Sequence, residues 1–157
     1  MQVFLDTYAT QGIRPTLARE ALAGFSTEAC QAMLAEPRTR VQVAEVEGHL
    51  VGFAQLALGS THELAPSGQQ VELSRLYVQA PFAGQGIGTA LLRGAEQLAR
   101  AAGATVLWLD SWVHNRRALG FYARHGYQDC GPTLDRFEDE SHENRVLAKR
   151  LDAGGPQ

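Results

Sequence analysis

The spacing of apolar residues divides this chain into stretches with helical and with strand periodicity. Three stretches near the start repeat their apolar side chains at helical spacing: residues 3–11, 16–24 and 27–36. Two strand-like stretches follow, at residues 41–47 and 50–58. The sequence Glu47-Gly48-His49 between them is typical of the turn of a β-hairpin. The first third therefore predicts three short helices and then two antiparallel strands.

The middle of the chain predicts a strand, a glycine-rich turn, a helix and a second strand. Residues 71–78 form the first strand, and Pro81 ends it. After the turn, apolar side chains at helical spacing indicate a helix with one buried face: Ile87, Leu91, Leu92, Ala95, Leu98 and Ala99. Residues 105–109 are apolar enough for a strand buried on both faces, which favours parallel pairing with 71–78. The unit is then a right-handed βαβ crossover.

The last third predicts one helix and two closing strands. The helix begins near Asn115 and ends at Gly126, and strands at 127–130 and 145–151 enclose a loop over 131–144. Neither a linker nor an internal repeat divides the chain, so we expect one domain over 1–151 with a disordered tail at 152–157. The expected fold class is α/β (α+β), a mixed sheet with helices on both faces.

Composition and charge exclude several functional classes. A net charge of −3 over 157 residues leaves no basic surface of the kind that binds nucleic acid. The start of the chain lacks the features of a signal peptide, and no apolar run approaches the roughly 20 residues of a membrane span. A cytoplasmic protein is therefore expected. The two cysteines and five histidines lack the spacing of metal ligands, so we expect free thiols and no metal.

The glycine-rich turn is the strongest chemical signal in the chain. Gly84, Gly86 and Gly88 follow a strand and open a helix, where free backbone amides and the helix dipole favour a phosphate group. A nicotinamide-binding turn would need glycine in place of Thr89 and a second nucleotide-binding half, which the chain lacks. A helix start without any ligand is the plain alternative. The turn thus predicts a diphosphate site.

A second motif narrows the interpretation. Residues 115–127 read N-x-x-A-x-x-F-Y-x-x-x-G-Y. Together with the glycine turn they resemble the two central motifs of the GNAT superfamily of acyl-CoA-dependent N-acyltransferases, over residues 41–151. The resemblance implies a sheet with two splayed parallel strands, acetyl-CoA as cosubstrate, no metal, and direct transfer to an amine in a ternary complex. Homodimers are common in the family. Its members normally begin with an edge strand, so here that strand is either absent or upstream of Met1.

The resemblance also implies which residues hold the cofactor. The clasp for the diphosphate consists of backbone amides at Ala83, Gly84, Gln85, Gly86, Ile87, Gly88 and Thr89. Alanine at the first position replaces the long polar residue usual in the family, so we expect somewhat weaker phosphate binding. Leu76, Tyr77 and Val78 offer backbone groups to the pantetheine arm and to the oxyanion. Asn115 contacts the same arm, caps its helix, or does both.

Two further roles concern the transferred proton. A lysine-like amine with a pKa of ~10.4 is neutral in only about one molecule in 2,500 at pH 7, so deprotonating it costs roughly 4.6 kcal/mol. A general base that accepts the proton offsets this cost. Glu72 is the expected base or substrate anchor, since strand alternation without a bulge places it on one face with Ser74, Leu76 and Val78. Asp110 is a second carboxylate for that role, and Tyr122 is the expected general acid for the leaving thiolate. A solvated carboxylate and a packed ring are the plain alternatives.

The amine acceptor is the least determined part of the prediction. The flanks of the second motif resemble most the PaiA-like branch, whose known members acetylate polyamines. The acidic stretch Glu138-Asp139-Glu140 could attract a polycation, although such stretches are usually only solvated. Trp112 either walls the acceptor pocket or packs in the core. We expect a small, polyamine-like primary amine; a protein or peptide acetyltransferase and a non-catalytic acetyl-CoA-binding module are the alternatives.

Overall fold

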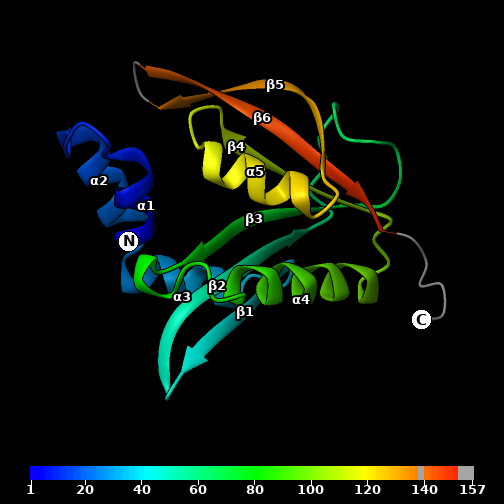
Figure 1. The fold of residues 1–157 in the computed structure, drawn as a ribbon, viewed down its shortest axis with the longest axis horizontal. Coiled ribbons are helices and arrows are strands. Elements are labelled where there is room, and N and C mark those ends of the chain that lie inside the picture. The colour runs from blue at the N-terminus through cyan, green and yellow to red at the C-terminus, as the bar shows by residue number, and fades with distance from the viewer. Residues whose placement is uncertain (138–139, 152–157) are drawn as a thin grey trace.

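The computed structural model describes residues 1–137 and 140–151, and these form one six-stranded sheet with helices on both faces (Figure 1). The elements follow the chain in this order: α1 (Gln2–Tyr8), α2 (Pro15–Gly24), α3 (Thr27–Ala35), β1 (Thr39–Val46), β2 (His49–Leu58), β3 (Gln70–Val78), the 3-10 turn η1 (Ala80–Phe82), α4 (Ile87–Ala101), β4 (Val106–Trp112), α5 (Arg116–Arg124), β5 (Gln128–Phe137) and β6 (Glu140–Arg150). The mixed α/β class predicted from the sequence is confirmed. The tail expected at 152–157 lies outside the described residues.

Side-chain caps set the starts of two helices. The Ser26 hydroxyl accepts a hydrogen bond from the Ala29 amide at 3.1 Å, at the start of α3. The Asn115 Oδ1 accepts one from the Ala118 amide at 3.1 Å, at the start of α5. Each cap satisfies a backbone donor that the first helical turn leaves unbonded. Asn115 therefore does cap its helix, one of the two roles considered for it.

The strand order is β1-β2-β3-β4-β6-β5, which places β1 and β5 at the two edges of the sheet. β3 and β4 run parallel and are joined by α4, so the predicted βαβ unit is present. The other neighbouring strands are antiparallel. Within the described residues, no strand precedes α1.

The loop predicted over 131–144 is wrong, because residues 131–137 and 140–144 are paired strand residues of β5 and β6. Gly131 and Pro132 are the residues that favour a loop in the sequence. In the fold they lie on an edge strand, where a proline need not break the hydrogen-bond ladder. A shift in register between Asp129 and Gly131 takes up the extra residue as a bulge.

β3 and β4 are paired over only part of their length. Their last paired residues are Glu72 and Trp108, although β3 continues to Val78 and β4 to Trp112. Over the same stretches β3 stays paired with β2, and β4 with β6. The two parallel strands therefore splay apart inside the sheet, as the resemblance implied.

A bulge in β3 changes which of its side chains share a face. The register between β2 and β3 slips by one residue, and Ser74 is left as the extra residue. An extra residue inverts the alternation of side chains beyond it. The prediction that Glu72 shares a face with Leu76 and Val78 is therefore wrong: Leu76 and Val78 pack on the core beneath α4, whereas Glu72 lies beside Trp108 on the opposite face.

The two faces of the sheet carry separate apolar clusters. The face that carries α4 and α5 holds the larger one, which includes Leu56, Leu73, Leu91, Leu92, Ala95, Leu107, Leu109 and Tyr122. On the opposite face Trp108 belongs to a smaller cluster. The first helices cover the rest of that face through aromatic contacts. The ring of Phe25 lies 6.2 Å from that of Tyr77, and the ring of Tyr8 lies 5.7 Å from that of Trp112. Among the described residues, no helix meets the length and hydropathy needed to cross a bilayer.

A buried carboxylate ties α4 to the last strands. Glu96 is only 6% exposed, and its Oε1 accepts from Lys149 Nζ at 2.9 Å and from the Tyr127 hydroxyl at 3.2 Å. Arg100 approaches its second oxygen at 3.8 Å. A carboxylate this deep is tolerated because it is both paired and hydrogen-bonded.

We expect Glu96→Ala to lower the free energy of unfolding by about 2 kcal/mol, because the Tyr127 hydroxyl and the Lys149 ammonium lose their shared acceptor. Urea unfolding followed by circular dichroism measures the change. Gln97→Ala, at the next and exposed position of α4, is the control and should stay within about 0.5 kcal/mol of the wild type. Equal stabilities of the two variants would contradict the role given to Glu96.

Candidate active site

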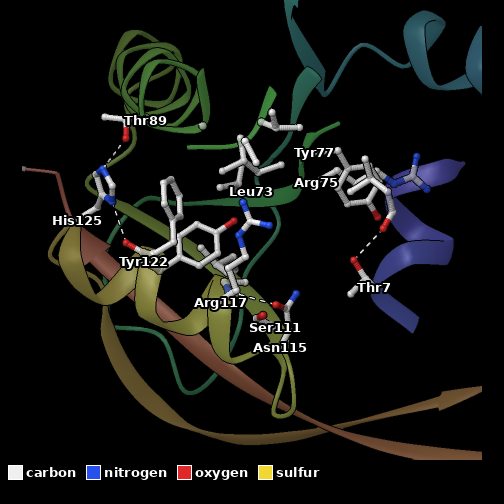
Figure 2. Close-up of a pocket in the computed structure, with 18 of the residues that line it drawn as sticks. Thr7, Leu73, Arg75, Tyr77, Thr89, Ser111, Asn115, Arg117, Tyr122 and His125 are labelled. Atoms are coloured by element: carbon white, nitrogen blue, oxygen red, sulfur yellow. Dashed lines mark hydrogen bonds between the residues drawn. The ribbon is translucent and has the colours of Figure 1, made fainter. Parts of the chain in front are cut away.

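A pocket of about 650 Å³ lies where β3 and β4 separate (Figure 2). On the face that carries α4 and α5, its lining includes the glycine loop and one side of α5. On the opposite face it is lined by α1, through Val3, Thr7 and Tyr8. Residues 73–78 of β3 and 109–111 of β4 form the walls between. The pocket therefore passes through the sheet and is open to one ligand from each face.

The loop before α4 presents unbonded backbone donors. Within the described residues, no acceptor is bonded to the N–H groups of residues 84–89, which include the first turn of α4. Gly84 and Gly86 have φ angles of 78° and 85°, in the left-handed region that glycine adopts without strain. No atom lies within 4 Å of where a Cβ would stand at either residue, so the loop faces open space. Free donors, helix dipole and space together favour an anion here.

The structure shortens the predicted clasp by one residue. The N–H of Ala83 is already bonded, because η1 ends with this amide donating to the Ala80 carbonyl at 3.1 Å. Ala83 lines the pocket, but the free donors begin at Gly84. Gly84, Gly86, Gly88 and Thr89 all line the pocket, whereas Gln85 and Ile87 do not. The last two can contribute only their backbone.

Tyr122 lies midway along the pocket. Its ring is 5.2 Å from that of Phe121 and 5.5 Å from that of Tyr127, and only 7% of the residue is exposed. Burial, followed by the nearby Tyr77, raises the pKa of Tyr122 above its usual range, so the phenol stays protonated. Its hydroxyl has no hydrogen-bond partner among the described residues and points into the gap between the strands (Figure 2). This is a suitable position for a proton donor to a ligand.

The free edge of β3 forms one wall of the pocket. Leu76, Tyr77 and Val78 line it, and Asn115 faces them from the start of α5. Because this stretch of β3 has no strand on its β4 side, its backbone groups on that edge are open to a ligand. An extended ligand could therefore bond to β3 as an added strand would.

Two carboxylates meet at the opposite end of the pocket. Asp110 lines the pocket near the end of β4, and its Oδ2 accepts from Asn144 Nδ2 at 3.2 Å. The same amide nitrogen donates to Asp135 Oδ2 at 2.7 Å. Burial, and after it the charge of Asp110, raises the pKa of Asp135. Within the described residues, neither carboxylate forms an ion pair with a lysine or arginine. This end therefore favours a cationic ligand.

Tyr8 closes the acidic end from α1, and sequence reasoning missed it. Burial raises the pKa of Tyr8 above its usual range, and the charges of Asp110 and Asp135 raise it further. The phenol thus stays neutral beside both carboxylates. The amphipathic pattern of residues 3–11 predicts a helix, but no local signal relates this helix to motifs so distant in the sequence. Asp135 and Asn144 were missed for a similar reason, since they lie in the hairpin predicted to be a loop.

Glu72 and Trp112 stand beside the pocket and do not line it. Glu72 Oε2 accepts a hydrogen bond from the Ser60 hydroxyl at 2.7 Å, at the point where β3 and β4 stop pairing. Its charge contributes to the raised pKa of Asp135, so Glu72 belongs to the same acidic region. Trp112 packs its ring against Tyr8, behind the pocket wall. Both residues can act on a ligand only through neighbours or through water.

Comparison with known proteins identifies the fold and the chemistry. The family model described as the acetyltransferase (GNAT) family matches residues 10–127, which include the glycine turn and the motif that carries Tyr122. This chain belongs to the GNAT family. It is therefore an N-acetyltransferase that uses acetyl-CoA.

Relatives and solved structures agree with this assignment. An uncharacterised N-acetyltransferase of Lactobacillus delbrueckii subsp. lactis is 28% identical over 152 residues, which are 96% of this chain and 87% of that protein. The PaiA N-acetyltransferase of Thermoplasma acidophilum, solved with coenzyme A, superposes with a TM-score of 0.75 at 20% identity, over 94% of this chain and 86% of the other. A GNAT acetyltransferase of Elizabethkingia anophelis, solved with acetyl-CoA, superposes with a TM-score of 0.62 at 17% identity, over 83% and 87%. The fold is consistent with the PaiA-like branch.

The residues of this GNAT chain fit the cosubstrate. The open glycine loop supplies free amides for a diphosphate, and the free edge of β3 leads from there toward Tyr122. The acetyl thioester is the activated group that acetyl-CoA brings to the site. Among residues 1–137 and 140–151, no cluster of histidine, cysteine and carboxylate side chains could hold a metal ion.

The raised pKa of Asp135 leads to a prediction with a definite sign. A carboxyl group whose pKa is higher in the folded state favours folding when protonated, and that contribution is lost as pH rises through the raised value. We therefore expect Asp135→Asn to raise the melting temperature at pH 7 by about 1–3 °C. The difference in melting temperature between the two proteins should vanish at a pH below the usual pKa of an aspartate, where the side chain at position 135 is neutral in both.

Asp129→Asn is the control of opposite sign. A hydrogen bond from Arg145 lowers the pKa of Asp129. The charged Asp129 carboxylate therefore stabilises the fold at pH values above the usual pKa of an aspartate, and Asp129→Asn should lower the melting temperature at pH 7. Calorimetric melting at pH 7 and at pH 3 measures both variants. A fall in melting temperature for Asp135→Asn at pH 7 would show that its charge is stabilising and contradict the assignment.

Proposed function

We propose that this GNAT enzyme transfers the acetyl group of acetyl-CoA directly to the primary amine of a small, polyamine-like cation, in a ternary complex. The observation that carries the proposal is the pocket through the sheet, with free amides at one end, Asp110 at the other with Asp135 behind it, and the Tyr122 hydroxyl between. Each ligand then enters from its own face, and the two reacting groups meet in the gap between β3 and β4.

The residues serve each stage of the transfer. The amine nitrogen attacks the thioester carbonyl, a C–N bond forms, and the oxygen becomes an oxyanion that a free backbone N–H of β3, at residues 76–78, stabilises. The C–S bond then breaks, and Tyr122 donates a hydrogen bond or its proton to the thiolate. A phenol pKa raised by burial makes complete proton transfer to a thiolate of pKa ~8.5 uphill, so the hydrogen bond is the main contribution.

Carboxylates at the acidic end bind the ammonium form of the acceptor and accept its proton. Asp110 lines the pocket and is placed to hold the incoming ammonium. Glu72 lies behind it and accepts the proton through water, because its own side chain does not reach the pocket surface. Removal of this proton offsets the roughly 4.6 kcal/mol that it costs to deprotonate an amine of pKa ~10.4 at pH 7. Tyr8 lines this end with Trp112 packed behind it, and the ring face of Tyr8 favours a cation.

The chemistry of relatives supports a small acceptor. An aminoalkylphosphonate N-acetyltransferase of Salmonella typhimurium is 35% identical over 97 residues, which are 62% of this chain and 62% of that protein. A streptothricin acetyltransferase of Streptomyces lavendulae is 34% identical over 97 residues, 62% and 48% of the two chains. Both names denote small molecules with amines. Asp110 and Asp135, which form no ion pair with a lysine or arginine among the described residues, favour a more cationic acceptor than an aminoalkylphosphonate.

An acceptor panel tests the proposed function. Purified enzyme is incubated with acetyl-CoA and one of three acceptor classes: polyamines, an aminoalkylphosphonate, or peptides with a free N-terminus or lysine. The appearance of free thiol is then measured. We expect kcat/KM to be highest for polyamines, by at least about tenfold, because only they place several charges near the carboxylates. A fully N-methylated polyamine is the control and should release no thiol. Turnover with peptides alone, or cofactor binding without turnover, would overturn the proposal.

The role of Tyr122 is tested by removing its hydroxyl. We expect Tyr122→Phe to lower kcat about 10- to 100-fold with the dissociation constant for coenzyme A within about twofold, because the hydrogen bond to sulfur forms as the thiolate develops. Tyr127→Phe is the matched control: its ring contacts Tyr122, but its hydroxyl bonds to Glu96 outside the pocket. Steady-state kinetics and calorimetry measure both variants. Unchanged turnover in Tyr122→Phe would remove it from the role of acid.

A further inference from the structure

Three cationic or titratable side chains line the pocket from α5: Arg117, Arg124 and His125. Arg117 and Arg124 are seven residues apart, which is about two helical turns, so they lie on the same side of the helix. Neither arginine forms an ion pair with a carboxylate among the described residues. The fold brings all three side chains to the lining of the pocket that also contains the glycine loop.

A hydrogen-bonded chain joins His125 to the first turn of α4. His125 Nδ1 lies 2.8 Å from the Phe121 carbonyl oxygen, which can only accept, so Nδ1 carries a proton and donates it. His125 Nε2 lies 3.1 Å from the Thr89 hydroxyl. Figure 2 shows His125 between Thr89 and α5, at the opposite end of the drawn pocket from Thr7. The imidazole therefore lies one hydrogen bond away from the loop of free amides.

The order of groups along coenzyme A determines which phosphate reaches this corner. With sulfur at Tyr122 and the diphosphate on the amides of residues 84–89, the adenosine lies beyond the diphosphate, toward the outer mouth. Its 3′-phosphate carries up to two negative charges, and the amides already serve the diphosphate. His125 is hydrogen-bonded to Thr89, and Arg124 is the residue before it in the chain. Both line the pocket, so they lie at this outer mouth. Arg117 is placed nearer Tyr122, along the inner part of the cleft (Figure 2).

The electrostatics of α5 make Arg124 necessary for this role. Arg124 is the last residue of the helix and His125 is its C-cap. The C-terminal end of a helix carries a partial negative charge, which repels an anion. A guanidinium at this position reverses the local sign and can bind a phosphate through two parallel hydrogen bonds.

We propose that Arg124 and His125 form a subsite for the 3′-phosphate of coenzyme A, by which the enzyme selects coenzyme A over its 3′-dephospho form. The proposal rests on acetyl-CoA being the donor in the proposed function. Arg124 supplies the charge and the paired donors. His125 accepts a hydrogen bond from the Thr89 hydroxyl at Nε2, because its Nδ1 carries the proton, and so holds Thr89 in place beside the loop.

Calorimetric titration with two ligands tests the subsite. Coenzyme A and 3′-dephospho-coenzyme A are titrated separately into wild-type enzyme and into Arg124→Gln. We expect the wild type to bind coenzyme A roughly 10- to 50-fold more tightly than the dephospho form, as a charge-assisted phosphate contact implies. Arg124→Gln should lose roughly tenfold in affinity for coenzyme A and stay within about twofold for the dephospho form. Because only one ligand responds, a general loss of folding cannot imitate this result.

Two further variants complete the design. Arg116→Gln removes an exposed arginine of the same helix that does not line the pocket, and its ratio of dissociation constants should equal that of the wild type. His125→Gln should reduce the ratio about two- to threefold, since Thr89 and the loop beside it lose the ring that holds them.

Each outcome of this comparison has one meaning. If neither ligand produces heat with the wild type, the proposed function itself fails. If both ligands bind equally tightly to the wild type, the enzyme has no 3′-phosphate subsite, while the acetyltransferase function stands. If the preference is present but unchanged in Arg124→Gln and His125→Gln, the subsite lies elsewhere and this assignment is overturned.

Discussion

The site depends on one break in hydrogen bonding, the end of the ladder between β3 and β4 after Glu72 and Trp108. Unpaired strand edges inside a protein are costly unless another group bonds to them. Here both strands keep their outer neighbours, so the sheet remains continuous around the gap. The gap thus creates a pocket and, along it, backbone groups that only a ligand can satisfy.

Packing on either side holds the gap open. On one face α4 and α5 bury the larger cluster, and the start of α4 lies against Phe121, whose ring would be in ordinary contact, at 3.6 Å, with a Cβ at Gly88. On the other face the first helices bring Tyr8 against Trp112. The bulge at Ser74 interrupts the regular pleat of β3 at the height of the pocket. Separation of the strands is therefore built in before any ligand arrives.

Charge is segregated along the pocket to match the two ligands. The donor end combines free amides with the positive side chains of α5, and the acceptor end combines Asp110 with Asp135. Tyr122 lies between and remains neutral because burial raises its pKa. In the proposed function, a polyanion and a polycation enter by opposite mouths, and their reacting atoms meet where the pocket has the least charge of its own.

Much of this enzyme could be predicted from sequence because the decisive signals are local. A strand, a glycine turn and an amphipathic helix occupy consecutive residues, so the βαβ unit, the amide clasp and Tyr122 follow from short motifs. Which face of β3 carries Glu72 and which carries Leu76 could not be predicted, because the bulge between them depends on pairing with the neighbouring strand. The same holds for the closing hairpin, whose proline is acceptable only because β5 lies at an edge.

By itself, then, the sequence determined the fold family, the donor chemistry and the cofactor loop, since each is encoded within one or two neighbouring elements. Only the tertiary structure decided which distant side chains gather at the acidic end of the pocket. Docking of a helix brings Tyr8 into the lining beside Asp110, and strand pairing brings Asp135 behind it, where Asn144 joins the two carboxylates. Such meetings depend on register and packing across the whole fold, which no short stretch of sequence contains.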